Sequence, residues 1–271
     1  MRAGTVASRP IVGVVTPRCY GHLLVALLER LRISAYVICE DDDGRLLLAR
    51  CIGWDDGPRW TLAGGGLDPG EQPRDGALRE LTEETGYTGE LEALIGVDAF
   101  RLVTTDAPPE GYDGDDFYAV RIVYRGRVTG GELTHEVDGT TDLAAWVPRD
   151  EIRTLDAVEL VTIGVAMLDE PGAPVRSEPD PTTRTTQPAS ISDRATVVQR
   201  VAAYGRTPDG RTAGGILEHG ADPAASVAAA FRATHGVDAD VVRPRDATST
   251  VDDGDGAARW VVTLEYDVEV R

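Results

Sequence analysis

Residues 64–87, with the sequence GGGLDPGEQPRDGALRELTEETGY, join a run of glycines to an acidic segment with helical spacing. At the three glycines the backbone can approach a ligand or a metal closely, because no side chain intervenes. Pro73 suits the first turn of a helix, where its missing N–H has no partner to lose. Gly86 suits the position just after the last turn. The stretch therefore predicts a glycine loop followed by a helix between these two residues.

Three glutamates of this helix share one face, because Glu80, Glu83 and Glu84 fall within an arc of about 100° around its axis. Like charges three or four residues apart weaken a helix by roughly a few tenths of a kcal/mol per pair. A bound Mg²⁺ or Mn²⁺, which prefers oxygen ligands, would offset this repulsion. A solvated acidic face is the alternative interpretation, and the glutamates alone do not decide between the two.

The whole chain is strongly acidic, with 46 Asp and Glu against 27 Lys and Arg and a net charge of −19 over 271 residues. Such a surface repels nucleic acid and anionic lipid, because binding either depends on basic side chains. The apolar runs are far shorter than the roughly 20 residues that cross a membrane, and the three cysteines fit no disulfide or metal framework. We therefore expect a cytoplasmic protein that binds neither a nucleic-acid duplex nor a membrane. A phosphate substrate would need a local cation to reverse the negative field.

The acidic stretch matches the pattern G-x5-E-x7-R-E-U-x-E-E-x-G-U, in which U is a bulky apolar residue, and so resembles the signature box of the Nudix hydrolase family. The matching residues are Gly65, Glu71, Arg79, Glu80, Leu81, Glu83, Glu84, Gly86 and Tyr87. The preceding residues 60–65, WTLAGG, resemble the family's W-x-L-P-G-G lead-in, with Ala63 in place of proline. Residues 146–152 resemble its closing strand and helix, so the resemblance covers residues 31–168.

The resemblance implies an α/β (α+β) fold, namely an α/β/α sandwich around a mixed sheet. It also implies a pyrophosphohydrolase that depends on Mg²⁺ or Mn²⁺. The substrate class is a small molecule in which a nucleoside diphosphate is linked to another moiety, such as an NTP, a nucleotide sugar or ADP-ribose. Water activated by the cation would attack phosphorus.

The resemblance also implies a role for each residue of the box. Glu80, Glu83 and Glu84 would hold the cation, with the carbonyl of Gly64 as a further ligand. Arg79 would orient the glutamates through charge-assisted hydrogen bonds. Glu71 would support the geometry between the loop and the helix and reach a metal through water.

A general base in this family often comes from a glutamate in the loop before the closing strand, here residues 130–145. Glu136 is the preferred candidate for the base. The loop also carries Glu132, Asp138 and Asp142, which stay open as alternatives, whereas His135 is interpreted as a loop residue.

The composition along the chain predicts four segments. They are an N-terminal extension with a short helix (residues 1–30, the helix at 23–31), the catalytic Nudix domain (31–168), a flexible linker rich in Pro, Ser and Thr (169–194) and a smaller segment (195–271). Within the catalytic domain we expect strands at 33–39, 46–49, 91–99 and 118–128 and a helix at 150–168. Because the linker is polar and rich in proline, we expect a chain ending after Asp169 to stay folded and active.

The last segment resembles a degenerate, truncated copy of the same domain, because residues 196–237 align without gaps on residues 46–87. Matching residues include Gly214, Gly215, Gly220, Pro223 and Gly236. Where the box has Glu71, Arg79, Glu80, Glu83 and Glu84, this segment has Ala221, Ala229, Ala230, Ala233 and Thr234. It should therefore hold no cation in that manner. An unrelated α+β appendage is the alternative, and a docking element, a homodimerisation element and a remnant all stay open as its role.

Two other functions fit the sequence less well. A nucleotide-binding sensor module of Nudix type would usually carry a basic DNA-reading domain, whereas residues 195–271 are acidic. An isomerase of the isopentenyl-diphosphate type would need a catalytic cysteine, and Cys51 stands in a different context from that family's. The substrate itself is not specified, because residues 102–105 lack the proline and the tyrosine typical of ADP-ribose and diadenosine polyphosphate enzymes.

Overall fold

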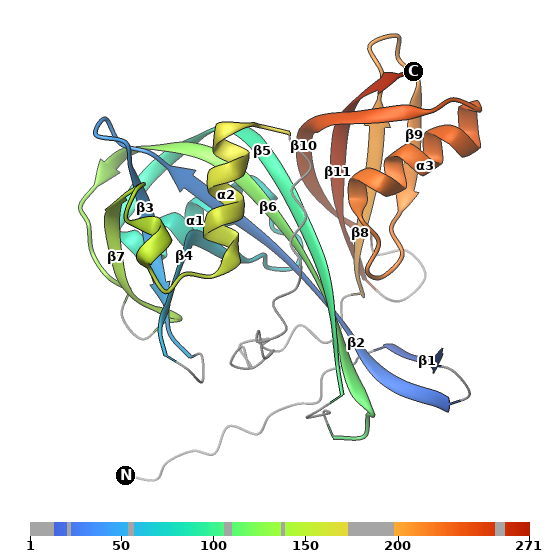
Figure 1. Ribbon diagram of the computed structural model, residues 1–271, viewed down its shortest axis with the longest axis horizontal. Helices are drawn as coiled ribbons and strands as arrows, with labels where there is room; N and C mark the ends of the chain where they lie inside the picture. Colours follow the sequence, from blue (N-terminus) through green and yellow to red (C-terminus); the bar gives the residue numbers. More distant parts are fainter. Residues whose placement is uncertain are drawn as a thin grey trace.

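The computed structural model describes residues 14–20, 23–53, 57–105, 110–136, 139–172, 198–252 and 258–271, with side chains from residue 27 onward. These residues form two β-sheets, one of seven strands and one of four, with helices packed on them (Figure 1). Among the described helices, none is long and apolar enough to cross a membrane.

The larger sheet is mixed. Its strands are β1 (Val14–Tyr20), β2 (Leu23–Cys39), β3 (Arg45–Cys51), β4 (Arg59–Gly66), β5 (Tyr87–Thr104), β6 (Gly114–Gly131) and β7 (Thr141–Pro148). Their order is β5-β6-β2-β4-β3-β7, with β1 paired to β2. β2 runs parallel to β6, while the other neighbouring pairs of this sheet are antiparallel.

Helices cover both faces of this sheet. They are α1 (Pro73–Thr85), the 3₁₀ turn η1 (Ile152–Thr154) and α2 (Glu159–Asp169). Side chains of a strand alternate between its faces, so Tyr36 and Ile38 of β2 pack in the cluster that contains Leu160 of α2. Val37 between them packs in a different cluster, with Leu81 of α1. The predicted sandwich around a mixed sheet is confirmed. Because both faces of the sheet are covered here, the consecutive residues Tyr36, Val37 and Ile38 all face an apolar cluster.

The predicted helix over residues 23–31 is wrong, because these residues form the first half of β2. They pair with β1 in antiparallel register, and from Leu27 onward β2 also pairs with β6, beginning opposite Gly114. The run LLVALLERL is rich in good helix formers. Its backbone groups nevertheless find partners in two neighbouring strands, and tertiary pairing of this kind outweighs intrinsic propensity.

The predicted helix over residues 150–168 begins only at Glu159. Before it, the chain runs beside β4: the N–H of Trp60 donates to the carbonyl of Asp156 at 2.8 Å, and the N–H of Val158 donates to the carbonyl of Trp60 at 2.8 Å. Backbone groups that are bonded to a strand are not available for helical hydrogen bonds. The helix therefore starts after this contact.

The smaller sheet belongs to the C-terminal unit, residues 198–271. Its elements are β8 (Val198–Arg206), β9 (Thr212–Ile216), α3 (Pro223–His235), β10 (Ala239–Asp252) and β11 (Arg259–Val270). The strand order is β10-β11-β8-β9, with antiparallel, parallel and antiparallel neighbours in turn. Along the path β5-β6-β2-β4 of the larger sheet, neighbouring strands are likewise antiparallel, parallel and antiparallel in turn. This correspondence supports the interpretation of a degenerate copy, which stays a prediction.

The pairing registers refine the comparison between the two units. Tyr204 of β8 lies opposite Gly214, as Tyr36 of β2 lies opposite Gly64. β8 therefore corresponds to β2, whereas the gapless alignment set the start of β8 against residues 48–51 of β3. From β9 onward the alignment agrees with the structure, since α3 begins at Pro223 and α1 at Pro73.

The C-terminal unit packs against the α1 side of the larger sheet. One apolar cluster contains Val120 and Ile122 of β6 together with Trp260 and Leu264 of β11. Polar contacts border this cluster: the hydroxyl of Tyr118 donates to the carbonyl of Ala221 at 2.5 Å, which joins β6 to the segment before α3. A second link joins the His219 side chain to Asp116, whose carboxylate is fully buried and also binds Arg101. The two units thus share a core.

A chain ending at Asp169 is therefore expected to be less soluble than the full chain. Val120 and Ile122 would lose their apolar cover, and exposed apolar patches promote association. The linker composition predicted that a chain ending after Asp169 would stay folded and active. Because the two units share a core, we no longer expect this. Soluble yield and sedimentation of residues 1–169, measured beside the full chain, test the point. A monomeric truncated protein that unfolds cooperatively would contradict it.

Candidate active site on the glycine loop and helix α1

The glycine loop fits tightly between β2 and α1. Gly64 has a φ of +145°, and a Cβ added there would lie 2.4 Å from the carbonyl oxygen of Ala35 and 2.5 Å from the Cα of Tyr36. At Gly65 an added Cβ would lie 2.7 Å from Oε1 of Glu80. Side chains at these positions would collide with backbone or with the glutamate. The glycines therefore bring the end of β4 into contact with the acidic face of α1.

Helix α1 has the ends that its sequence predicts. Pro73 occupies its first turn, and Gly86 ends it with a φ of +74° while its N–H donates to the carbonyl of Thr82. Ala77 and Leu81 are buried in the core of the domain. The glutamates lie on another side of the helix, which faces the glycine loop.

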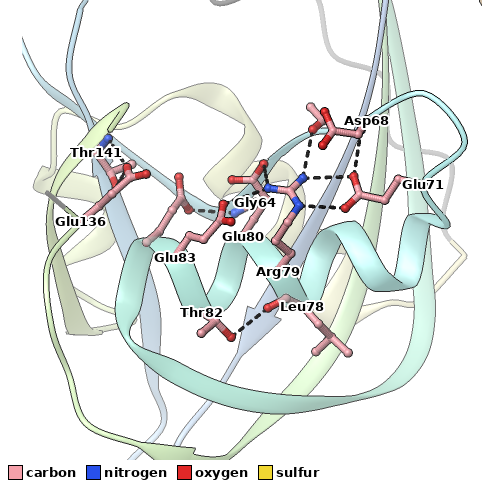
Figure 2. Close-up of polar contacts among 12 residues, drawn as sticks. Gly64, Asp68, Glu71, Leu78, Arg79, Glu80, Thr82, Glu83, Glu136 and Thr141 are labelled. Carbon is pink, nitrogen blue, oxygen red and sulfur yellow. Dashed lines mark hydrogen bonds and ion pairs between the residues drawn. The ribbon is translucent and has the colours of Figure 1, made fainter. Parts of the chain in front are cut away.

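Arg79 is the centre of the polar network in Figure 2. Its Nε donates to Oε1 of Glu71 at 2.8 Å and its Nη2 to the other oxygen of Glu71 at 3.1 Å. Its Nη1 donates at 2.9 Å both to Glu80 and to Glu83. The hydrogen bonds to Glu71, with the charge of Glu80 beside them, raise the pKa of the guanidinium. Arg79 therefore stays charged and orients three carboxylates, as charge-assisted pairs do.

Glu71 also closes the loop that precedes the helix. Its Oε2 accepts the hydrogen bond from Nη2 of Arg79 and a second one from the backbone N–H of Asp68 at 2.8 Å (Figure 2). A further bond runs from Nη2 of Arg79 to the carbonyl of Gly66 at 3.4 Å. The glycine loop, the turn at residues 68–71 and the helix are thus connected through Arg79 and Glu71.

Glu84 is the most deeply buried glutamate of the box, with 3% of its surface exposed. The backbone N–H of Gly64 donates to its Oε2 at 2.9 Å. Burial raises the pKa of this carboxyl well above its usual range, and the nearby charges of Glu80, Glu136 and Glu83 raise it further, against the lowering effect of the Gly64 bond. Burial also raises the pKa of Glu80, although Arg79 opposes that shift.

The donor set fits a divalent cation of the magnesium type. In the described parts of the chain, no three His, Cys, Asp or Glu side chains are already arranged around a metal position. Nevertheless, burial of Glu84 beside Glu80 and Glu83 concentrates negative charge that a cation would neutralise. Carboxylate oxygens are the ligands that Mg²⁺ and Mn²⁺ prefer. That these three glutamates, with the Gly64 carbonyl and Glu71, hold a cation stays a prediction.

Glu136 approaches the same carboxylates from the loop before β7. Its Oε2 accepts hydrogen bonds from the backbone N–H of Thr141 at 2.9 Å and from its hydroxyl at 2.8 Å. Its charge contributes to the raised pKa of Glu84, and in Figure 2 it lies at the same end of the glutamate face as Glu83. The structure thus brings the preferred candidate for the base close to the box.

The other acids of this loop fit the role of base less well. Asp142 accepts two hydrogen bonds at 2.9 Å from the guanidinium of Arg50, which holds its pKa below the usual value. Glu132 is exposed, and Asp138 lies outside the described residues. Nδ1 of His135 accepts a hydrogen bond from the N–H of Ala144 at 3.1 Å, as expected of a loop residue.

Arg32, which no motif of the sequence singles out, also lies at the site. Its guanidinium carbon would be 3.6 Å from a Cβ added to Gly66. Its charge, like that of Arg79, opposes the rise in the pKa of Glu80 that burial causes. Arg32 stands on β2, where the pairing with β4 brings it beside the glycine loop. An arginine in the middle of a strand carries no local signal of this position.

The sequence of this chain also matches known proteins. A family model described as the NUDIX domain matches residues 30–162. The MutT-like protein of Streptomyces ambofaciens is 30% identical over 150 residues, which are 55% of this chain and 84% of that protein. This chain belongs to the Nudix family.

Other Nudix relatives match shorter parts. An RNA pyrophosphohydrolase of Cereibacter sphaeroides (strain ATCC 17029 / ATH 2.4.9) is 49% identical over 53 residues, which are 20% of this chain and 32% of that protein. The chain thus spans about a third of that relative. Among solved structures, a NUDIX hydrolase from Nitrosomonas europaea is 24% identical, with a TM-score of 0.42, over 52% of this chain and 89% of that chain.

Proposed function

We propose that this Nudix protein hydrolyses a phosphoanhydride bond in a small molecule that contains a nucleoside diphosphate linked to another group, with Mg²⁺ or Mn²⁺ as cofactor. The observation that carries the proposal is the buried carboxylate of Glu84, which lies beside Glu80 and Glu83 and against the glycine loop. The name of the RNA pyrophosphohydrolase, a relative over part of the chain, supports cleavage of a pyrophosphate.

The cation would be held by Glu80, Glu83 and Glu84, with the Gly64 carbonyl as a further ligand and Glu71 reaching it through water. When bound, the cation stabilises charge on the phosphate oxygens and acidifies the attacking water. Arg79 keeps the glutamates oriented through its four hydrogen bonds to carboxylate oxygens. The bonds from Arg79 also keep the acidic side chains from separating by mutual repulsion.

Glu136 would take the proton of the attacking water. Its charge acts on Glu84, so its carboxylate is near enough to the glutamates of the box to act beside the cation. The two bonds from Thr141 fix one oxygen of its carboxylate. A base held in this way needs no reorganisation as the proton moves, which favours proton transfer in the transition state.

We expect turnover to require a divalent cation and to be abolished by excess EDTA. Without a cation, the net charge of −19 and the glutamates of the box would repel a phosphate substrate. Release of phosphate or nucleotide is measured with the full chain on NTPs, nucleotide sugars, ADP-ribose, NADH and dinucleoside polyphosphates, with added Mg²⁺ restoring turnover after EDTA. Undiminished turnover in EDTA would refute the metal-dependent mechanism. Nucleotide binding with no release from any of these compounds would favour a sensor module.

A further inference from the structure

The C-terminal unit contacts the Nudix box directly through the side chain of Gln72. Its Nε2 donates to the carbonyl of Ser249 at 2.7 Å, and its Oε1 accepts from the N–H of the same residue at 2.9 Å. The side-chain amide thereby pairs with the peptide groups of β10 in the manner of a neighbouring strand. Gln72 is also the N-cap of α1, yet its side chain makes no capping bond to the helix. Its side chain is used for the contact between the units.

On the C-terminal side the partner of Gln72 is buried and hydrogen-bonded within the smaller sheet. Ser249 is 6% exposed, and its hydroxyl accepts a hydrogen bond at 2.9 Å from Nε1 of Trp260, which is fully buried. Ser249 also stands within the β10–β11 ladder, opposite Val262. Two residues further on, Val251 meets the same loop of the box, because a Cβ added to Gly70 would lie 3.1 Å from its Cγ2. β10 therefore meets the loop at two points.

On the Nudix side the anchored residue is next to the acidic network. Glu71 precedes Gln72 in the chain. Its carboxylate accepts hydrogen bonds from Nε of Arg79 and from the N–H of Asp68, both at 2.8 Å. The turn between Asp68 and Gln72 includes Gly70 with a φ of +86°, a conformation that glycine adopts readily but does not enforce. This turn is held by Arg79 from within the site and by β10 from outside it.

We propose that Gln72 is a positioning residue through which β10 holds the loop before α1 in its active geometry. The proposal rests on the proposed function, because it assigns the C-terminal unit a part in the activity of the Nudix site. With Gln72 bound to Ser249, Glu71 stays in reach of Arg79, and Arg79 stays in reach of Glu80 and Glu83. A unit that carries none of the glutamates of the box at the aligned positions thus supports the site that has them.

Gln72→Ala in the full chain is expected to weaken Mn²⁺ binding and to lower kcat, each by about 3- to 10-fold, with a smaller change in KM. Loss of a direct partner of a metal ligand costs roughly 10–100-fold in metal affinity or activity, and Gln72 is one contact further out. Mn²⁺ affinity is measured by titration of the metal-free protein, so this readout does not depend on any substrate. Gln72→Asn keeps the amide but is too short to reach Ser249. If the alanine variant does not fold, Mn²⁺ affinity and kcat are measured in Gln72→Asn instead, with the same losses expected.

Tyr118→Phe is the matched control, because it removes one hydrogen bond between the same two units without contacting the loop. It should lower the melting temperature and leave Mn²⁺ affinity and kcat as in the unmodified protein. Wild-type Mn²⁺ affinity and kcat in Gln72→Ala would overturn the proposal, as would equal losses in both variants. If the unmodified chain shows no cation-dependent turnover, the proposed function fails, and the Mn²⁺ titrations still decide the role of Gln72.

Discussion

Glu84→Gln is expected to lower turnover by about 10²-fold or more, because it removes charge from the group that holds the cation. Glutamine keeps the size and helix propensity of glutamate, and its oxygen can still accept the hydrogen bond from the N–H of Gly64. The fold should therefore survive the change. In the metal-free protein the substitution should even raise the melting temperature, because a buried carboxylate beside two other glutamates no longer has to be ionised.

The pH dependence of this stabilisation has a defined sign. The folded-state pKa of Glu84 is raised above its ordinary value of 4.5. A carboxyl whose pKa is raised on folding stabilises the folded protein in its protonated form. This contribution is fully present below the unfolded pKa and is lost as the pH rises through the folded pKa. The gain in melting temperature of metal-free Glu84→Gln over the unmodified protein should therefore grow as the pH rises above about 4.5, and thermal unfolding across this range measures it.

Glu83→Gln is the matched control, since it removes the same charge from the same face of α1. The Glu83 side chain is 49% exposed and accepts a hydrogen bond from Arg79. Its loss should lower turnover without raising the melting temperature of the metal-free protein. Near-normal turnover in both variants would mean that the box is not the active site. An unchanged melting temperature in Glu84→Gln would mean that burial of its carboxylate does not destabilise the fold.

The part of the site that could be predicted from sequence is the part that is local. Pro73 and Gly86 mark the ends of α1, and the spacing of Glu80 and Glu84 sets their common face whatever the surroundings. The three glycines likewise predict a close approach of the backbone, which the structure shows at Gly64. The helix ends and the shared face depend on contacts within about one or two helical turns, whereas the partner of the glycine loop, Tyr36 of β2, is distant in sequence.

The parts that sequence did not predict depend on distant partners. The composition of residues 23–31 is typical of a helix. They form a strand because they pair with distant residues, among them those of β6, which begins at Gly114. The Gln72–Ser249 contact joins positions 177 residues apart. From its sequence, the unit that supplies Ser249 could be a docking element, a homodimerisation element or a remnant. Similarly, nothing near Asp142 in sequence indicates that Arg50 binds its carboxylate. No local pattern specifies which distant groups a strand or a carboxylate will meet.

Glu136→Gln is expected to reduce turnover by about 10²–10⁴-fold, the range that a general base contributes, while Mn²⁺ affinity changes little. The amide oxygen can still accept the two bonds from Thr141, so the loop should keep its geometry. What is lost is the ability to take up a proton. Measurement of kcat and Mn²⁺ affinity in the same preparation therefore separates this variant from Glu84→Gln, in which both quantities should fall.

Glu132→Gln supplies the control for charge, because Glu132 is an exposed acid of the same loop. Its turnover should stay close to that of the unmodified protein. Should Glu136→Gln keep near-normal turnover while Glu132→Gln loses it, the base is Glu132, since the carboxylate of Asp142 is bound to Arg50. A fall in Mn²⁺ affinity as large as the fall in kcat would instead make Glu136 a ligand of the cation, because a base that only accepts a proton has no reason to change metal binding.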